Sequence, residues 1–172
     1  MKKNLQIREI RESELRKLGN LMIDVYSKLE GFPAQSEQPR YYETLADIGR
    51  FTEKKDAKVL VAIAYEGELV GGVVYFGDMA EYGSGGSATN EKNVSGIRFL
   101  AVDERFRNMG VGKALTLFCI DLARNQKIIS LSCTRPRLCK SHGIFMKNLV
   151  LRGLKTWISC KNNFQFLDLD SI

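Results

Sequence analysis

The stretch Phe99-Leu-Ala-Val-Asp-Glu-Arg-Phe-Arg-Asn-Met-Gly-Val-Gly-Lys-Ala114 decides the fold of this chain. Its first residues continue an apolar strand that is predicted to end at Val102, and a charged turn follows. Gly110 and Gly112 then lie at the start of a predicted helix. The apolar residues of that helix repeat along one face, at Val111, Leu115, Phe118 and Leu122. The pattern predicts a strand, a glycine-containing turn and a helix.

Such a turn favours an anion. The first backbone N–H groups of a helix have no acceptor within it, and glycine lets a phosphate approach the backbone. A P-loop would need Gly at the position of Arg107 and Ser or Thr at the position of Ala114. A dinucleotide fingerprint would need a third Gly where Leu115 stands. What remains is Arg-x-x-Gly-x-Gly, at Arg107, Gly110 and Gly112.

Hydrophobic periodicity predicts the elements around this stretch. Strands are expected over 5–10, 59–65, 69–76 and 94–102, and residues 128–131 are expected to start a further strand. A first helix is expected to begin at the N-cap Ser13 and to end before Gly31, and a shorter one covers 42–51. The order predicts one α/β domain over 1–172, a mixed central β-sheet flanked by helices.

Length and composition are those of a globular domain. The 172 residues are 44% hydrophobic and 27% charged, and no apolar run reaches the roughly 18 residues of a membrane span. We therefore expect a cytoplasmic protein with no membrane partner. The net charge is +6, but 132–172 hold 7 Lys or Arg against 2 Asp or Glu. Because the excess lies in this tail, no nucleic-acid-binding face is predicted.

Within this element order, the segment from Leu100 to Ala114 resembles the GNAT superfamily of N-acetyltransferases. The resemblance spans 5–131 and implies the GNAT-like acyl-CoA N-acyltransferase fold. In that family the turn binds the pyrophosphate of acetyl-CoA, and the end of the preceding strand hydrogen-bonds the pantetheine arm. The resemblance therefore assigns co-substrate binding to Leu100, Ala101, Val102, Arg107, Asn108, Met109, Gly110, Val111, Gly112 and Lys113. The alternative is a strand-to-helix turn in which the glycines only allow a tight bend and bind no co-substrate.

The implied chemistry is direct attack of a primary amine, in a small molecule or a peptide, on the thioester of acetyl-CoA. The amine must lose a proton and the leaving thiolate must gain one. The family usually supplies the acid as a Tyr in the pattern Tyr-x-x-x-Gly-Phe, and no Tyr follows Tyr82 here. No catalytic residue is assigned. Conceivable bases flank a glycine-rich loop, at Asp78, Glu81, Tyr82 and Glu91, although for each of them the favoured reading is a solvated loop residue.

Two rival functions remain: a remnant that keeps the coenzyme pocket without activity, and an adenine-nucleotide-binding module. The family often pairs through its C-terminal strands, so a homodimer is a further expectation.

The tail from about residue 132 departs from the rest of the chain. It holds three of the four Cys, the only His and the only Trp, and no Glu. Read one base out of frame, Met146-Lys147 must encode Glu and Trp157-Ile158 must encode Asp. With permitted codons the same bases yield a Tyr-x-x-x-Gly-Phe pattern on an amphipathic helix, its Tyr arising from Phe145-Met146. We hypothesise that this tail is a frameshifted translation of the usual C-terminal part.

A metal site is not predicted in the tail. Cys133, Cys139, His142 and Cys160 include no C-x₂-C pair, and disulfides are rare in cytosolic proteins. Cys119 lies within the predicted helix and is expected to pack in the core.

Overall fold

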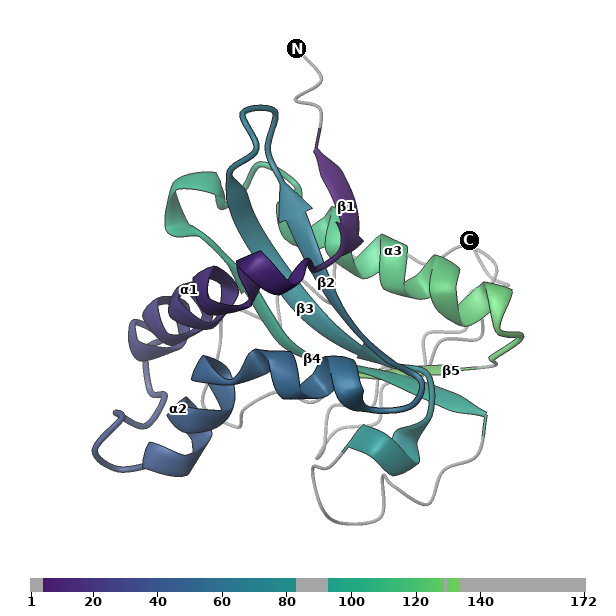
Figure 1. The fold of residues 1–172 in the computed structure, drawn as a ribbon, viewed down its shortest axis with the longest axis horizontal. Helices are drawn as coiled ribbons and strands as arrows, with labels where there is room; N and C mark the ends of the chain where they lie inside the picture. The colour runs from purple at the N-terminus through teal and green to yellow at the C-terminus, as the bar shows by residue number, and fades with distance from the viewer. Residues whose placement is uncertain (1–4, 83–92, 129, 134–172) are drawn as a thin grey trace.

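The computed structural model describes residues 5–82, 93–128 and 130–133. The hypothesis of a shifted reading frame, the candidates Glu91 and His142, and the Cys residues after Cys133 lie outside these ranges. The described elements are β1 (Gln6–Glu9), η1 (Glu12–Glu14), α1 (Leu15–Ser27), α2 (Pro39–Ala46), η2 (Ile48–Glu53), β2 (Ala57–Ile63), β3 (Leu69–Phe76), η3 (Met79–Tyr82), β4 (Val94–Val102), η5 (Glu104–Phe106), α3 (Val111–Asn125) and β5 (Ser130–Cys133) (Figure 1).

The described strands form one mixed sheet in the order β1-β2-β3-β4-β5. Strands β1 to β4 are antiparallel neighbours, whereas β5 pairs with β4 in parallel. The connection between β4 and β5 is the helix α3, as a parallel pair requires. The mixed α/β architecture and the order of its elements confirm the prediction from the sequence.

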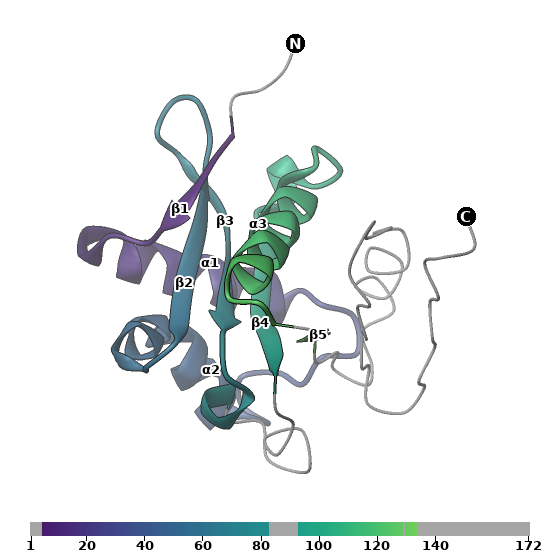
Figure 2. The same ribbon diagram turned by 90° about the vertical axis from the view of Figure 1, so that its right-hand side faces the viewer.

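Helices cover both faces of the sheet (Figures 1 and 2). Strand β3 is buried along its whole length because each face meets a helical layer. One core cluster joins α1, α2 and η2 to one face, with Leu18, Leu45, Phe51 and Phe76 among its members. The second cluster lies under α3 on the other face and includes Leu115, Ile120 and the fully buried Cys119. The packing role predicted for Cys119 is therefore confirmed.

Two local predictions were wrong. Ser13 does not cap the first helix: it lies inside η1, and α1 begins at Leu15. The carboxylate of Glu14 instead accepts a hydrogen bond from the Arg11 N–H at 2.9 Å. The helix expected over 42–51 is interrupted at Asp47 (φ −96°, ψ 47°), which separates α2 from the 3₁₀ turn η2. Its apolar side chains still reach the core, so the periodicity predicted burial better than continuity.

Candidate functional site

The junction between β4 and α3 is a tight turn with two residues in the left-handed conformation. Asp103 caps η5 by accepting a hydrogen bond from the Arg105 N–H at 2.9 Å. The chain then turns through Asn108 (φ +61°) and Gly110 (φ +83°) and enters α3 at Val111. A left-handed residue is what glycine adopts without steric cost. Gly110 therefore sets the direction in which α3 leaves the turn.

The amino end of α3 presents backbone donors that the helix does not use. The first hydrogen bond of the helix runs from Ala114 N to Gly110 O at 2.9 Å. The N–H groups of Val111, Gly112 and Lys113 precede it and have no acceptor within the helix. A Cβ placed on Gly110 would meet no atom within 4 Å. Donors with open space beside them, at the positive end of a helix dipole, form a site for an anion.

Two cations flank these amides. Arg107 and Lys113 are both exposed, and neither takes part in an ion pair within the described part of the chain. An exposed cation without a bound partner is free to pair with phosphate oxygens. The side chains of Asn108 and Met109 are also exposed on the turn. The predicted residues of the turn thus lie together around the open helix end.

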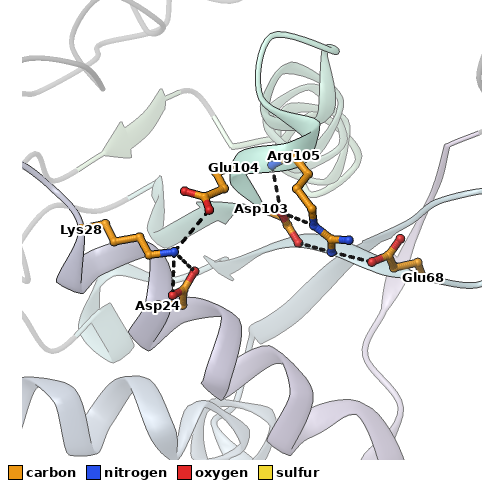
Figure 3. Close-up of polar contacts among 6 residues, drawn as sticks. All are labelled: Asp24, Lys28, Glu68, Asp103, Glu104 and Arg105. Carbon is orange, nitrogen blue, oxygen red and sulfur yellow. Dashed lines mark hydrogen bonds and ion pairs between the residues drawn. The ribbon is translucent and has the colours of Figure 1, made fainter.

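Arg105, between the strand and the turn, is committed to other partners (Figure 3). Its guanidinium contacts Asp103 Oδ2 at 2.7 Å and Glu68 Oε1, in the β2–β3 hairpin, at 2.6 Å. The hydrogen bond from Arg105 holds the pKa of Asp103 below its ordinary value. Arg105 itself is exposed, so these pairs add little stability, but they fix the turn to the neighbouring hairpin.

A second polar contact ties the same turn to helix α1. Lys28 Nζ lies 2.9 Å from Asp24 Oδ1 and 3.3 Å from Glu104 Oε1, so it joins the end of α1 to η5 (Figure 3). The hydrogen bond to Asp24, helped by that to Glu104, raises the pKa of Lys28. The turn is thus held from two sides while its far end stays open.

Strand β5 accompanies only the first part of β4. Ala101 and Val102 pair with Gly72 and Gly71 of β3. On the other edge β5 pairs with Val94–Ile97, and no strand of the described residues accompanies Leu100–Val102 there. Ala101 is buried and Leu100 and Val102 are half-buried. The backbone of this segment faces a position where an extended chain fits as a strand would.

Gly71 allows α3 to begin close to this strand end. A Cβ at this position would lie 2.9 Å from Ala101 O and 3.1 Å from Val111 Cγ1. Any larger residue would push the helix away from β3 and β4. Because of this contact, the open amides of α3 and the end of β4 lie side by side.

The conceivable bases on the described residues have structural partners. Asp78 Oδ1 accepts a hydrogen bond from Ala80 N at 2.8 Å, and Glu81 pairs with Lys54 at 3.3 Å. Tyr82 is fully buried and its hydroxyl donates to Ile97 O at 3.0 Å. These contacts give all three side chains structural roles, and the burial of Tyr82 contradicts its reading as a solvated loop residue. In the ranges that the structure describes, no group of three or more His, Cys, Asp or Glu side chains is placed to hold a metal ion.

One residue near the site was not singled out from the sequence. Arg98 is the only charged residue of the strand VSGIRFLAV, and that isolated charge was the available signal. The face on which it lies depends on pairing with β3, which the local pattern does not encode.

Comparison with known proteins identifies the family of the chain. A sequence model described as the acetyltransferase (GNAT) family matches residues 20–148, which is more than half of the chain. None of the curated proteins compared with the chain matches it. In the described residues no helix is long and apolar enough to span a membrane.

Solved structures share the fold at low sequence identity. A GNAT-family acetyltransferase from Staphylococcus aureus Mu50 is 19% identical, over 84% of this chain and 82% of its own, with a TM-score of 0.65. The PaiA N-acetyltransferase from Thermoplasma acidophilum, solved with coenzyme A, is 15% identical over 84% and 88%, with a TM-score of 0.66. AAC(6′)-Iy, solved with a bisubstrate analogue of CoA and acetylneamine, is 16% identical over 93% and 99%, with a TM-score of 0.62.

The matched residues 20–148 include β4, the turn and α3. The chain belongs to the GNAT family of acetyltransferases, acyl-CoA-dependent N-acyltransferases that use acetyl-CoA as co-substrate.

Proposed function

We propose that this protein moves the acetyl group of acetyl-CoA to a primary amine, of a small molecule or a peptide, by direct attack of the amine on the thioester. The observation that carries the proposal is the open amino end of α3, where the amides of Val111, Gly112 and Lys113 have no intrahelical acceptor. This end lies beside the last residues of β4, beyond the stretch Val94–Ile97 that pairs with β5.

The pyrophosphate is assigned to the turn. Its oxygens would accept hydrogen bonds from the first amides of α3, while Arg107 and Lys113 supply positive charge. The helix dipole contributes only about 0.3–1 kcal/mol at an exposed end, so directed hydrogen bonds must provide most of the affinity. The left-handed Gly110 keeps the approach free of a side chain.

The pantetheine arm is assigned to the edge of β4 at Leu100–Val102, beyond the stretch that pairs with β5. Its amide groups would pair with the backbone of β4 as an added strand does, and the buried side chain of Ala101 makes a backbone role the natural one. From the turn, the arm would run back along β4 and bring the thioester toward Phe99. This places the reacting carbon next to the middle of the sheet.

The assignment is tested by isothermal titration of the full chain with acetyl-CoA, CoA and ATP, followed by thiol-release assays across a panel of amines. We expect acetyl-CoA and CoA to bind at one site and at least one amine to release CoA. Binding of ATP with no response to acetyl-CoA would instead favour the nucleotide-binding module. Binding of acetyl-CoA without thiol release over the whole panel would favour the remnant.

The proposal includes a cytoplasmic enzyme of one domain over 1–172, assembled as a homodimer and without a nucleic-acid partner. Cell fractionation and light scattering of the purified chain test the location and the dimer.

A further inference from the structure

A β-bulge in β4 puts the consecutive side chains of Arg98 and Phe99 on one face of the sheet. Val74 pairs with Arg98 and Gly72 with Ala101, so Phe99 and Leu100 together oppose the single Val73. Phe99 has φ 56°, the left-handed conformation that absorbs the extra residue. As a result Phe99 joins the core cluster on the α1 and α2 face, directly after Arg98.

The guanidinium of Arg98 lies on aromatic rings of that same face. It is 4.5 Å from the centroid of Phe99 and 5.3 Å from that of Tyr82, within cation–π distance of both. Its Nη1 donates to Tyr82 O at 2.6 Å. Regular alternation would have pointed Arg98 and Phe99 to opposite faces, so the bulge creates this stacked arrangement.

Arg98 is half-buried and has no counter-ion among the described residues. No carboxylate of the described residues pairs with it, and only Nη1 has a hydrogen-bond acceptor there. Removing a charge from water without a partner is costly, whereas the remaining N–H edge of a guanidinium matches a carboxylate in two parallel hydrogen bonds. The arrangement is one that an anionic ligand would complete.

The neighbouring phenol of Tyr41 adds a neutral donor. Its ring lies 5.8 Å from that of Phe99, centroid to centroid. Burial raises the pKa of Tyr41 to about 12, an effect that the nearby charge of Arg98 and a hydrogen bond with Tyr26 partly oppose. The hydroxyl therefore stays protonated and adds no charge of its own beside Arg98.

Arg98 lies near the position expected for the thioester of the co-substrate, and here the inference rests on the proposed function. An arm bound along Leu100–Val102 delivers its acyl end at the bulge. Arg98 is two residues further along β4, roughly 7 Å away at about 3.3 Å per residue. A group held by Arg98 would thus lie within one small molecule's length of the thioester.

We infer that the acceptor is a primary amine that also carries a carboxylate, and that Arg98 binds this carboxylate and so orients the amine toward the thioester. Amino acids and similar amino carboxylates are the substrate class. Arg98 is a specificity-determining residue in this account, and it takes no part in the proton transfers.

The test compares matched pairs of acceptors in the full chain. L-Leucine, L-phenylalanine, L-glutamine and β-alanine are each assayed beside the corresponding carboxamide, with thiol release giving kcat and KM separately. We expect the carboxylate form to be favoured by about tenfold to a hundredfold in kcat/KM for the accepted compounds, mainly through KM.

Three variants locate the effect. Arg98→Met is expected to remove the preference for the carboxylate while the Kd for CoA stays unchanged, which also reports that the variant is folded. Arg98→Lys should retain part of the preference. Arg50→Met is the matched control, because Arg50 also lies over a ring of the same cluster, 5.8 Å from the centroid of Phe51, yet is exposed. It should leave the preference intact.

Equal use of acids and amides by the wild-type chain, turnover of uncharged amines alone, or a carboxylate preference that survives Arg98→Met would each overturn the inference while leaving the acetyltransferase intact. Failure of the wild-type chain to bind acetyl-CoA would contradict the proposed function itself, and this inference with it.

Discussion

Two glycines of this chain share a conformation and differ in their surroundings. Gly67 (φ +79°) and Gly110 (φ +83°) are both left-handed, and a Cβ on either would meet nothing within 4 Å. In the β2–β3 turn, Gly67 N donates to Ala64 O at 2.9 Å and Ala64 N to Glu68 O at 2.8 Å. At the start of α3 the amides after Gly110 have no helical acceptor. Unused donors, rather than glycine geometry, therefore distinguish the proposed anion site.

Ala substitutions at the two glycines test this difference between the two turns with the largest expected effect. Ala at either position pays for a left-handed backbone, about 1–2 kcal/mol of unfolding free energy. Only Gly110→Ala places a methyl group where the diphosphate is expected, so we predict a rise in the Kd for CoA of about tenfold or more for this variant alone. Thermal melts give the shared stability loss and calorimetry gives the affinities. An equal Kd for both variants would refute the distinction.

The two arginines of the turn extend the comparison to charge. Arg107 is without an ion pair among the described residues, whereas Arg105 is held by Asp103 and Glu68. Arg107→Ala should raise the Kd for CoA by about fivefold at low salt and weaken its salt dependence, because exposed charges are screened over about 10 Å at 0.1 M salt. Titrations at two salt concentrations measure both effects. Arg105→Ala serves as the control, and a larger loss there would contradict the assignment.

A variant far from the turn should change stability without changing affinity. Arg8 lies 2.6 Å from Glu14, and the hydrogen bond from Arg8 lowers the pKa of Glu14 to about 2. The pKa is depressed on folding, so this stabilisation is present above the unfolded value of about 4.3 and is lost as the pH falls toward 2. Glu14→Gln should therefore cost about 1–3 kcal/mol at pH 7.

Denaturant titrations of the wild-type chain and Glu14→Gln between pH 7 and pH 2 measure this difference, which should shrink below pH 5. Glu12→Gln is the control, since Glu12 is exposed and pairs with no cation in the described ranges. A difference that is independent of pH would show that the ion pair is not its source.

Local patterns predicted most of the fold and part of the site. The strand before the turn, its glycines and the helix after it are encoded within one continuous stretch, so these elements could be predicted from spacing. The bulge at Phe99 could not, because it arises from pairing with β3. For the same reason the local sequence pattern could not predict which face of the sheet carries Arg98. The Ser13 prediction was wrong because the carboxylate of Glu14 binds both Arg8 and the Arg11 amide.

The hypothesis of a shifted reading frame after about residue 132 stays a prediction. The DNA sequence and the intact mass of the natural protein test it. A mass equal to that of the printed 172 residues would exclude a sequencing error as its origin. If the printed tail is the real one, we expect the sheet to lose partners for its last strands and the chain to be unstable. A cooperative melt above about 60 °C would contradict that expectation.

The central claim concerns the backbone donors at the start of α3, and a ¹⁵N–¹H correlation spectrum recorded during a titration with CoA observes them directly. We predict that the amide signals of Val111, Gly112 and Lys113 move with a single saturable binding curve, while that of Gly67 stays in place. Saturable binding of CoA that leaves all three signals unmoved would contradict this account.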